Sequence, residues 1–114
     1  MLNRNMKIII TESRRDRLAK QELDKNFSNM YEDVDYVTDS MGERTTISYR
    51  NGDGVIMIYN EGADVLYICD DVTKPLEFFS YTPQQLKDLI GEWFSDKFEL
   101  PVNIIQHVPK GLLN

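Results

Sequence analysis

Two adjacent carboxylates, Asp70 and Asp71, are the side chains in this sequence best placed to do chemistry. They follow residues 65–69, an apolar run that predicts a buried central strand. A pair of carboxylates can serve acid–base chemistry or hold Mg²⁺. However, consecutive residues on a strand point to opposite faces, so we expect a solvated strand end rather than a shared site.

His107 and Cys69 are the single histidine and the single cysteine of the chain. A zinc site needs about four protein ligands, or three in a catalytic site, so these two residues do not form one. A Cys69–His107 nucleophile pair is an alternative, but within an apolar strand a cysteine usually acts as a small buried hydrophobe. No phosphate-binding glycine loop or nucleophile elbow occurs. The sequence therefore predicts no catalytic residue, no metal and no cofactor.

Residues 51–54, Asn-Gly-Asp-Gly, match the middle of a calcium-binding EF-hand loop. In that alignment the first ligand position is Tyr49 and the last is Asn60, so the two most important carboxylates are missing. The flanking residues also predict strands rather than helices. We therefore interpret this segment as a turn.

Three arginines, Arg14, Arg15 and Arg17, lie at the start of a predicted helix, where the helix dipole favours acidic side chains. They are either solvated or face an acidic partner. The run is short and interrupted by an acid, so we do not expect it to bind nucleic acid. Phe78 and Phe79 are core residues or part of an interface. We take these five residues as the candidate interaction surface.

The spacing of apolar side chains predicts the elements that hold these residues. A β-branched run at residues 7–10 predicts a strand, and Ser13 can cap the helix that follows. This helix has a narrow apolar stripe at spacings of three to four residues. The stripe consists of Leu18, Ala19, Leu23, Phe27 and Met30.

Residues 33–71 predict short strands separated by turns. Asn51-Gly52 is a strong hairpin signal, because a type I′ turn needs positive φ at both of its central residues. The last two strands are apolar on both faces and should be central, so the helices are expected on opposite faces of the sheet. A shared face would leave the other face partly apolar. The predicted strands are residues 34–38, 45–50, 55–59 and 65–69.

The clearest helix start is Thr82-Pro83, a cap followed by proline at the first helical position. Residues 83–98 show a broad apolar face, and Gly91 within it indicates close packing there. Residues 76–81 are an optional strand, and residues 102–108 predict a last one. We predict an α+β fold: an antiparallel meander sheet of four to six strands with two amphipathic helices, in the order β-α-β-β-β-β-(β)-α-β.

The chain has 114 residues, which predicts one domain over residues 1–114 with tails at residues 1–5 and 109–114. Its net charge is −6, and residues 32–71 carry ten acidic and two basic side chains, which disfavours nucleic acid and anionic membranes as partners. No apolar stretch is long enough for a membrane span, and the opening residues are too polar for a secretory signal. A single cysteine allows no internal disulfide, which favours a reducing compartment. These features predict a soluble cytoplasmic protein.

The opening from Lys7 to Ser13, a strand and cap that run into a charged helix, resembles the start of many small proteins of tailed phages. Arginines follow Ser13 here, whereas those openings often have glutamine. These phage proteins share no common activity. The resemblance therefore implies only a phage accessory or virion protein, located in the host cytoplasm or the virion.

The leading hypothesis is a non-enzymatic module that binds a protein partner, self-associates or docks into a larger assembly. A first alternative is a small-molecule-binding or hydrolytic domain with a pocket between sheet and helix, using Asp70, Asp71 or His107. A second alternative is an acidic inhibitor that mimics a nucleic acid through residues 32–71.

Overall fold

The computed structural model describes residues 12–40, 42–52 and 54–113, and it confirms the predicted α+β class. One five-stranded sheet has the order β1-β2-β3-β4-β5; the first four strands pair antiparallel and β5 pairs parallel to β4. The strand predicted at residues 7–10 lies outside the described residues. The strands are β1 (Tyr31–Asp39), β2 (Gly42–Asn51), β3 (Gly54–Asn60), β4 (Val65–Ile68) and β5 (Ile104–His107). The helices are α2 (Glu12–Asn26), α3 (Asp70–Thr73) and α4 (Pro83–Phe98), with 3-10 turns η1 (Lys74–Phe79) and η2 (Lys110–Leu112).

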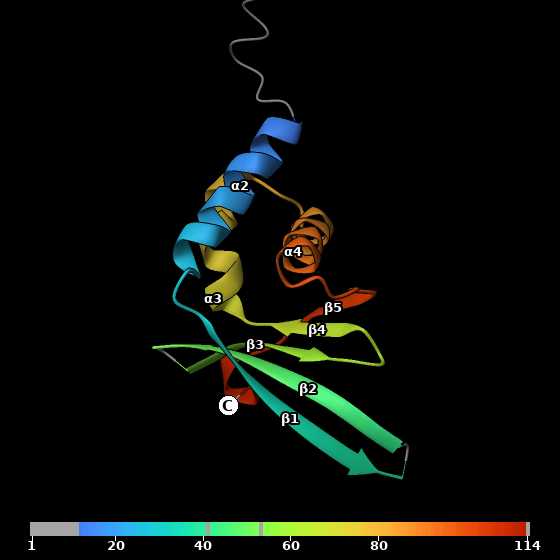
Figure 1. Ribbon diagram of the computed structural model, residues 1–114. Coiled ribbons are helices and arrows are strands. Elements are labelled where there is room, and N and C mark those ends of the chain that lie inside the picture. Colours follow the sequence, from blue (N-terminus) through green and yellow to red (C-terminus); the bar gives the residue numbers. More distant parts are fainter. Residues whose placement is uncertain (1–11, 41, 53, 114) are drawn as a thin grey trace, which may run out of the picture.

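The labelled helices α2, α3 and α4 lie on one face of the sheet, and the C-terminal segment lies on the other (Figure 1). The helices are therefore not divided between the two faces as the two-faced strands suggested. On the helical side, Tyr49 and Tyr59 are fully buried against Phe94. On the other side, the cross-strand neighbours Ile58 and Tyr67 are half-buried. Residues 109–113, expected to form a tail, include η2 and the buried Leu113.

Helix α4 begins as the sequence predicts. The side-chain oxygen of Thr82 accepts a hydrogen bond from Gln85 N at 3.2 Å, and Gln85 Oε1 accepts one from Thr82 N at 3.0 Å. Gly91 packs against β5, because an added Cβ would lie 3.0 Å from Ile105 Cδ1. Glycine therefore allows the close approach of α4 and β5 that its position inside an apolar helix face indicated.

The prediction of an optional strand at residues 76–81 is wrong, because the 3-10 turn η1 covers most of this segment. Pro75 lies in its first turn, where the fixed φ of proline suits the start of a helical turn. The three-residue repeat of a 3-10 helix places Leu76 and Phe79 on the same side. Leu76 is buried and Phe79 half-buried, whereas Phe78 points outward and is 71% exposed.

The hairpin between β2 and β3 is present, but its turn begins one residue later than predicted. Asn51 pairs with Gly54, so Asn51 ends β2 and residues 52 and 53 connect the strands. The register shifts between Tyr49 and Arg50, where Ile56 is an extra residue on β3. This bulge shifts the pairing of β2 with β3 by one residue beyond the turn.

Two fully buried tyrosines differ in their hydrogen bonding and provide a first prediction. The Tyr59 hydroxyl donates to Pro101 O at 2.6 Å and lies 3.0 Å from Asp64 Oδ1, whereas the Tyr49 hydroxyl has no partner among the described residues. We expect Tyr59→Phe to lower the free energy of unfolding by about 1–3 kcal/mol, because it leaves acceptors unpaired. Tyr49→Phe should change it by less than about 1 kcal/mol, because no hydrogen bond is lost. Urea denaturation measures both values, and equal losses would contradict this interpretation.

Candidate functional site

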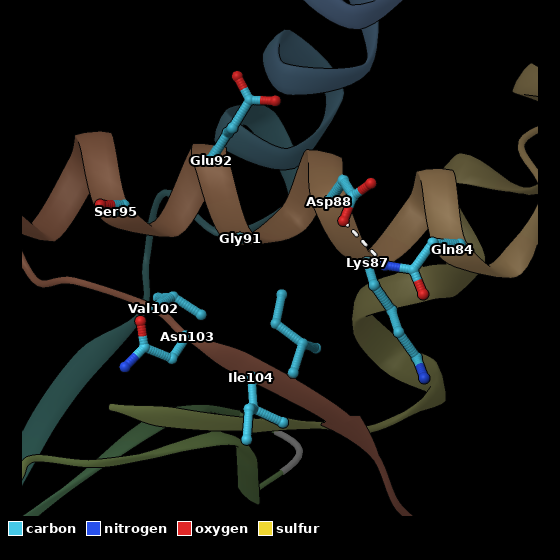
Figure 2. Close-up of a pocket in the computed structure, with 10 residues that line it drawn as sticks. Gln84, Lys87, Asp88, Gly91, Glu92, Ser95, Val102, Asn103 and Ile104 are labelled. Carbon is cyan, nitrogen blue, oxygen red and sulfur yellow. Dashed lines mark hydrogen bonds between the residues drawn. The ribbon is translucent and has the colours of Figure 1, made fainter. Parts of the chain in front are cut away.

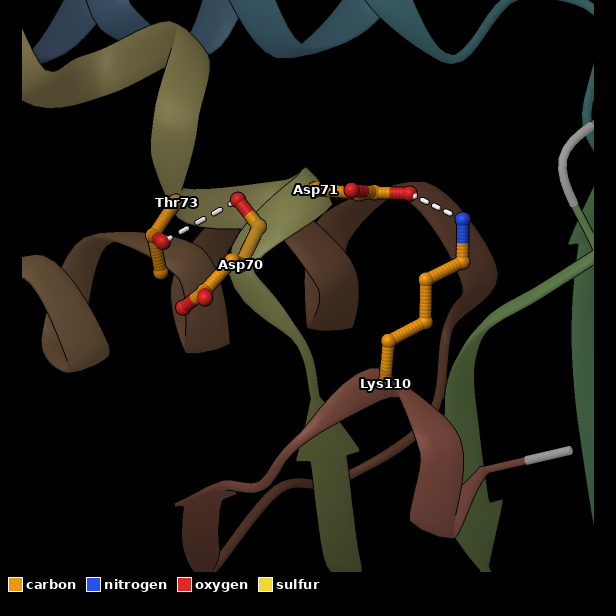
Figure 3. A network of polar contacts seen from close by, with 4 residues as sticks. All are labelled: Asp70, Asp71, Thr73 and Lys110. Atoms are coloured by element: carbon orange, nitrogen blue, oxygen red, sulfur yellow. Dashed lines mark hydrogen bonds and ion pairs between the residues drawn. The ribbon is translucent and has the colours of Figure 1, made fainter.

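Asp70 and Asp71 begin α3, directly after β4. Both lie in the first helical turn, where the helix dipole favours negative charge. In Figure 3 the two carboxylates point in different directions, and Asp71 Oδ2 lies 2.7 Å from Lys110 Nζ. Thr73 Oγ1 donates to the Asp70 carbonyl at 3.2 Å. The two acids therefore make separate contacts and do not form a shared carboxylate site.

The Asp70 carboxylate pairs with His107, whose Nε2 lies 2.6 Å from Asp70 Oδ1. The register of the parallel strands explains this contact, because His107 lies opposite Ile68, two residues before Asp70. Val108 N donates to Ile68 O at 2.8 Å and extends the same ladder. The structure thus brings together Asp70 and His107, two of the three residues that the small-molecule hypothesis names, whereas Asp71 pairs with Lys110.

His107 also lines a cavity of about 260 Å³ between the sheet and the start of α4. The apolar part of its lining consists of Ile68, Tyr81, Pro83 and Leu86. The polar part consists of Thr73, Lys87 and His107. Sequence reasoning missed Lys87 and Thr73, since neither belongs to a motif and only the folded chain places them beside His107.

Cys69 gains no support as a nucleophile. It is fully buried, and this burial raises the pKa of its thiol, which therefore stays protonated at neutral pH. Within the described part of the chain, His107 contacts Asp70 and forms no hydrogen bond with a serine, threonine or cysteine side chain.

A second hollow, a groove of about 660 Å³, lies between α4 and β5 (Figure 2). Along its helical wall, Gln84 Nε2 donates to Asp88 Oδ1 at 2.9 Å. Figure 2 shows Glu92 pointing away from β5. The helix and the strand touch at Gly91, and the groove beside this contact is lined by Lys87, which also lines the cavity at His107, and by Asn103 of the opposite wall.

Of the three arginines in the predicted interaction surface, Arg15 packs against an aromatic ring of the chain itself. The Arg15 guanidinium lies 4.3 Å from the ring centre of Tyr81, and the Tyr81 hydroxyl donates to Asp16 Oδ1 at 2.7 Å. Burial, followed by the hydrogen bond to Asp16, raises the pKa of Tyr81. The cation–π contact gives Arg15 a favourable place despite the helix dipole. Arg14 and Arg17 are exposed.

The aromatic candidates continue this row of side chains. Phe78 stacks on Phe79 with ring centres 4.3 Å apart, and Phe79 lies 6.2 Å from Tyr81. The structure therefore connects Arg15 to Phe78 through Tyr81 and Phe79, on adjacent elements α2 and η1. Whether this row binds a partner stays a prediction.

The two most exposed large apolar side chains among the described residues of the sheet, Tyr36 and Tyr31, lie on β1, which the sequence did not single out. Tyr36 is 83% exposed, Tyr31 58% and Val34 42%. β1 forms one edge of the sheet, and the β2–β3 ladder starts only at Thr46, so the distal parts of β1 and β2 project as a two-stranded arm (Figure 1). The sequence feature that could have indicated this exposed strand is the absence of lysine and arginine from residues 31–39.

Within residues 12–40, 42–52 and 54–113, no group of three or more histidine, cysteine or acidic side chains could hold a metal ion. No helix in the described ranges is long and apolar enough to cross a membrane. No protein family, curated protein or solved structure matches this chain.

Proposed function

We propose that this chain is a non-enzymatic protein-interaction module that binds an extended, basic segment of a partner protein along the outer edge of β1. The observation that carries the proposal is the outer edge of this nine-residue strand, with which no other strand of the described residues pairs. An unpaired strand edge presents backbone N–H and C=O groups, and proteins bind extended segments there by adding a strand.

The charge of β1 identifies the class of partner. Glu32, Asp33 and Asp35 are exposed, and no lysine or arginine occurs in the strand. Of these three acids, Asp33 forms an ion pair within the described residues: its Oδ2 lies 3.4 Å from Arg50 Nε on β2. A lysine- or arginine-containing strand would neutralise this edge, because opposite charges on adjacent strands attract.

The apolar side chains of β1 supply the second part of the interface. Val34 pairs with Ile47 and Tyr36 with Thr45, so both project on the helical side of the arm. An added strand that alternates basic and apolar residues would cover Val34 and Tyr36 on the helical side and place its charges near Asp33 and Asp35, which project on the opposite face. Exposed tyrosines are also common contact residues at protein interfaces.

The same charges disfavour the self-associating form of the leading hypothesis through this edge. Two copies of β1 would bring acid against acid, and like charges on adjacent strands repel. The nucleic-acid mimic shares the acidic segment but needs no strand addition. A phage origin and a cytoplasmic or virion location stay predictions.

The test uses a peptide of about nine residues that alternates lysine and valine, the length of β1. We expect it to bind and to protect β1 amides from hydrogen exchange, as followed by NMR. Asp33→Lys combined with Asp35→Lys should weaken binding by about tenfold, because both acids lie on the face that receives the lysines and two attractive contacts become repulsive. Increased salt should also weaken binding, since exposed charges are screened.

The matched control is Glu77→Lys combined with Asp96→Lys, which changes the net charge equally at exposed sites on η1 and α4. It should bind the peptide like the unchanged protein. Tyr36→Ala should weaken binding, and Phe78→Ala, at another exposed aromatic, should not. Equal binding of a peptide that alternates glutamate and valine, or peptide contact without protection of β1, would reject the proposal.

A further inference from the structure

The cavity beside His107 combines an apolar interior with a positively charged side. Ile68 is 1% exposed and forms part of its wall together with Tyr81 and Leu86. Its volume of about 260 Å³ lies just below the range of cavities that hold drug-sized ligands, so it suits a small molecule. A ring or a short hydrocarbon chain fits this volume.

The ammonium group of Lys87 determines the charge that the cavity prefers. Lys87 lines it, and no carboxylate of a described residue lies within ion-pair distance of Lys87 Nζ. The acid nearest to the other polar wall, Asp70, is already paired with His107. The cavity also adjoins the first two turns of α4, where the helix dipole adds positive potential.

We propose that this cavity binds a small amphipathic anion, with its apolar part against Ile68, Tyr81 and Leu86 and its negative group beside Lys87. Asp70 acts as a positioning residue that holds the His107 ring at the cavity wall. The Thr73 hydroxyl offers a neutral hydrogen-bonding group at the same wall. This site is separate from the β1 edge and does not depend on it.

The test compares three probes of similar shape: 3-phenylpropanoate, 3-phenylpropan-1-ol and 3-phenylpropylamine. Titration by ¹H–¹⁵N NMR should shift the amides of Ile68, Thr73, Leu86 and His107 together. The carboxylate should bind about fivefold more tightly than the alcohol, as expected for one partly solvated ion pair. Lys87→Gln should remove this preference while leaving the affinity for the alcohol unchanged.

Lys74→Gln is the matched control, because Lys74 is exposed on η1 and does not line the cavity. It should keep the preference for the carboxylate. The NMR spectrum reports in the same experiment whether each variant is folded. Tighter binding of the amine, equal binding of carboxylate and alcohol, or shifts at Gly91 and Val102 in the α4–β5 groove would overturn the proposal.

Discussion

Replacing Phe94 with alanine should lower the free energy of unfolding by about 3–5 kcal/mol, the largest effect we expect from a single substitution. Phe94 is fully buried on α4 at the centre of an aromatic cluster. Its ring centre lies 5.2 Å from that of Tyr49, 5.5 Å from that of Tyr59 and 4.8 Å from that of Phe98. Alanine would leave a cavity between helix and sheet that rigid aromatic rings cannot fill.

Phe78→Ala is the matched control, since it removes the same atoms from a side chain that is 71% exposed. This substitution should lower the free energy of unfolding by less than about 1 kcal/mol, because an exposed side chain makes few packing contacts. Urea or thermal unfolding measures both variants. Similar losses for the two would show that α4 does not pack on β2 and β3 as the structure has it.

The sequence predicted correctly those parts of the fold that depend on residues close together in the chain. The cap at Thr82 and the apolar face that contains Phe94 specify α4 without reference to the rest of the chain. The segment at residues 76–81 was not predictable in this way, because short apolar runs suit strands and helical turns equally. There, Pro75 favours a helical turn, because its fixed φ suits the first turn of a helix.

The candidate site was less predictable than the fold. Its central contact, Asp70 with His107, joins residues far apart in sequence and exists only because β5 pairs parallel to β4. The predicted meander has only antiparallel neighbours, so it does not predict that β5 pairs parallel to β4. Lys87 illustrates the same limit, since its role depends on which wall of the cavity α4 supplies.

The exposure of β1 also depends on contacts between residues far apart in the sequence. The sequence indicated an acidic strand near residues 34–38 that is polar on one face, as is common in antiparallel sheets. It did not indicate that Tyr36 would be 83% exposed, because tyrosine in a strand is commonly half-buried. The helices cover the central strands, and the distal arm extends beyond them (Figure 1).

Raising the pH from about 10 to about 12 should reduce the stability of the fold through its buried tyrosines. Burial, followed by the hydrogen bond to Asp64, raises the pKa of Tyr59 from its ordinary value of 10.0 to about 12. In this interval the unfolded chain releases the proton while the folded protein keeps it, so the stability present below pH 10 is lost as the pH rises. The Tyr59 contribution amounts to about 2–3 kcal/mol. Burial also raises the pKa of Tyr49, which acts in the same direction.

Tyr59→Phe isolates this contribution, because phenylalanine has no proton to lose while the rest of the chain titrates as before. Urea denaturation at about pH 9 should show the variant to be less stable than the unchanged protein, since its hydrogen bonds to Pro101 and Asp64 are missing. Toward pH 12 the two stabilities should converge, because only the unchanged protein loses the Tyr59 contribution. Parallel losses over the whole interval would mean that Tyr59 ionises as easily in the folded protein as in the unfolded chain, which is incompatible with a buried hydroxyl that donates to Pro101.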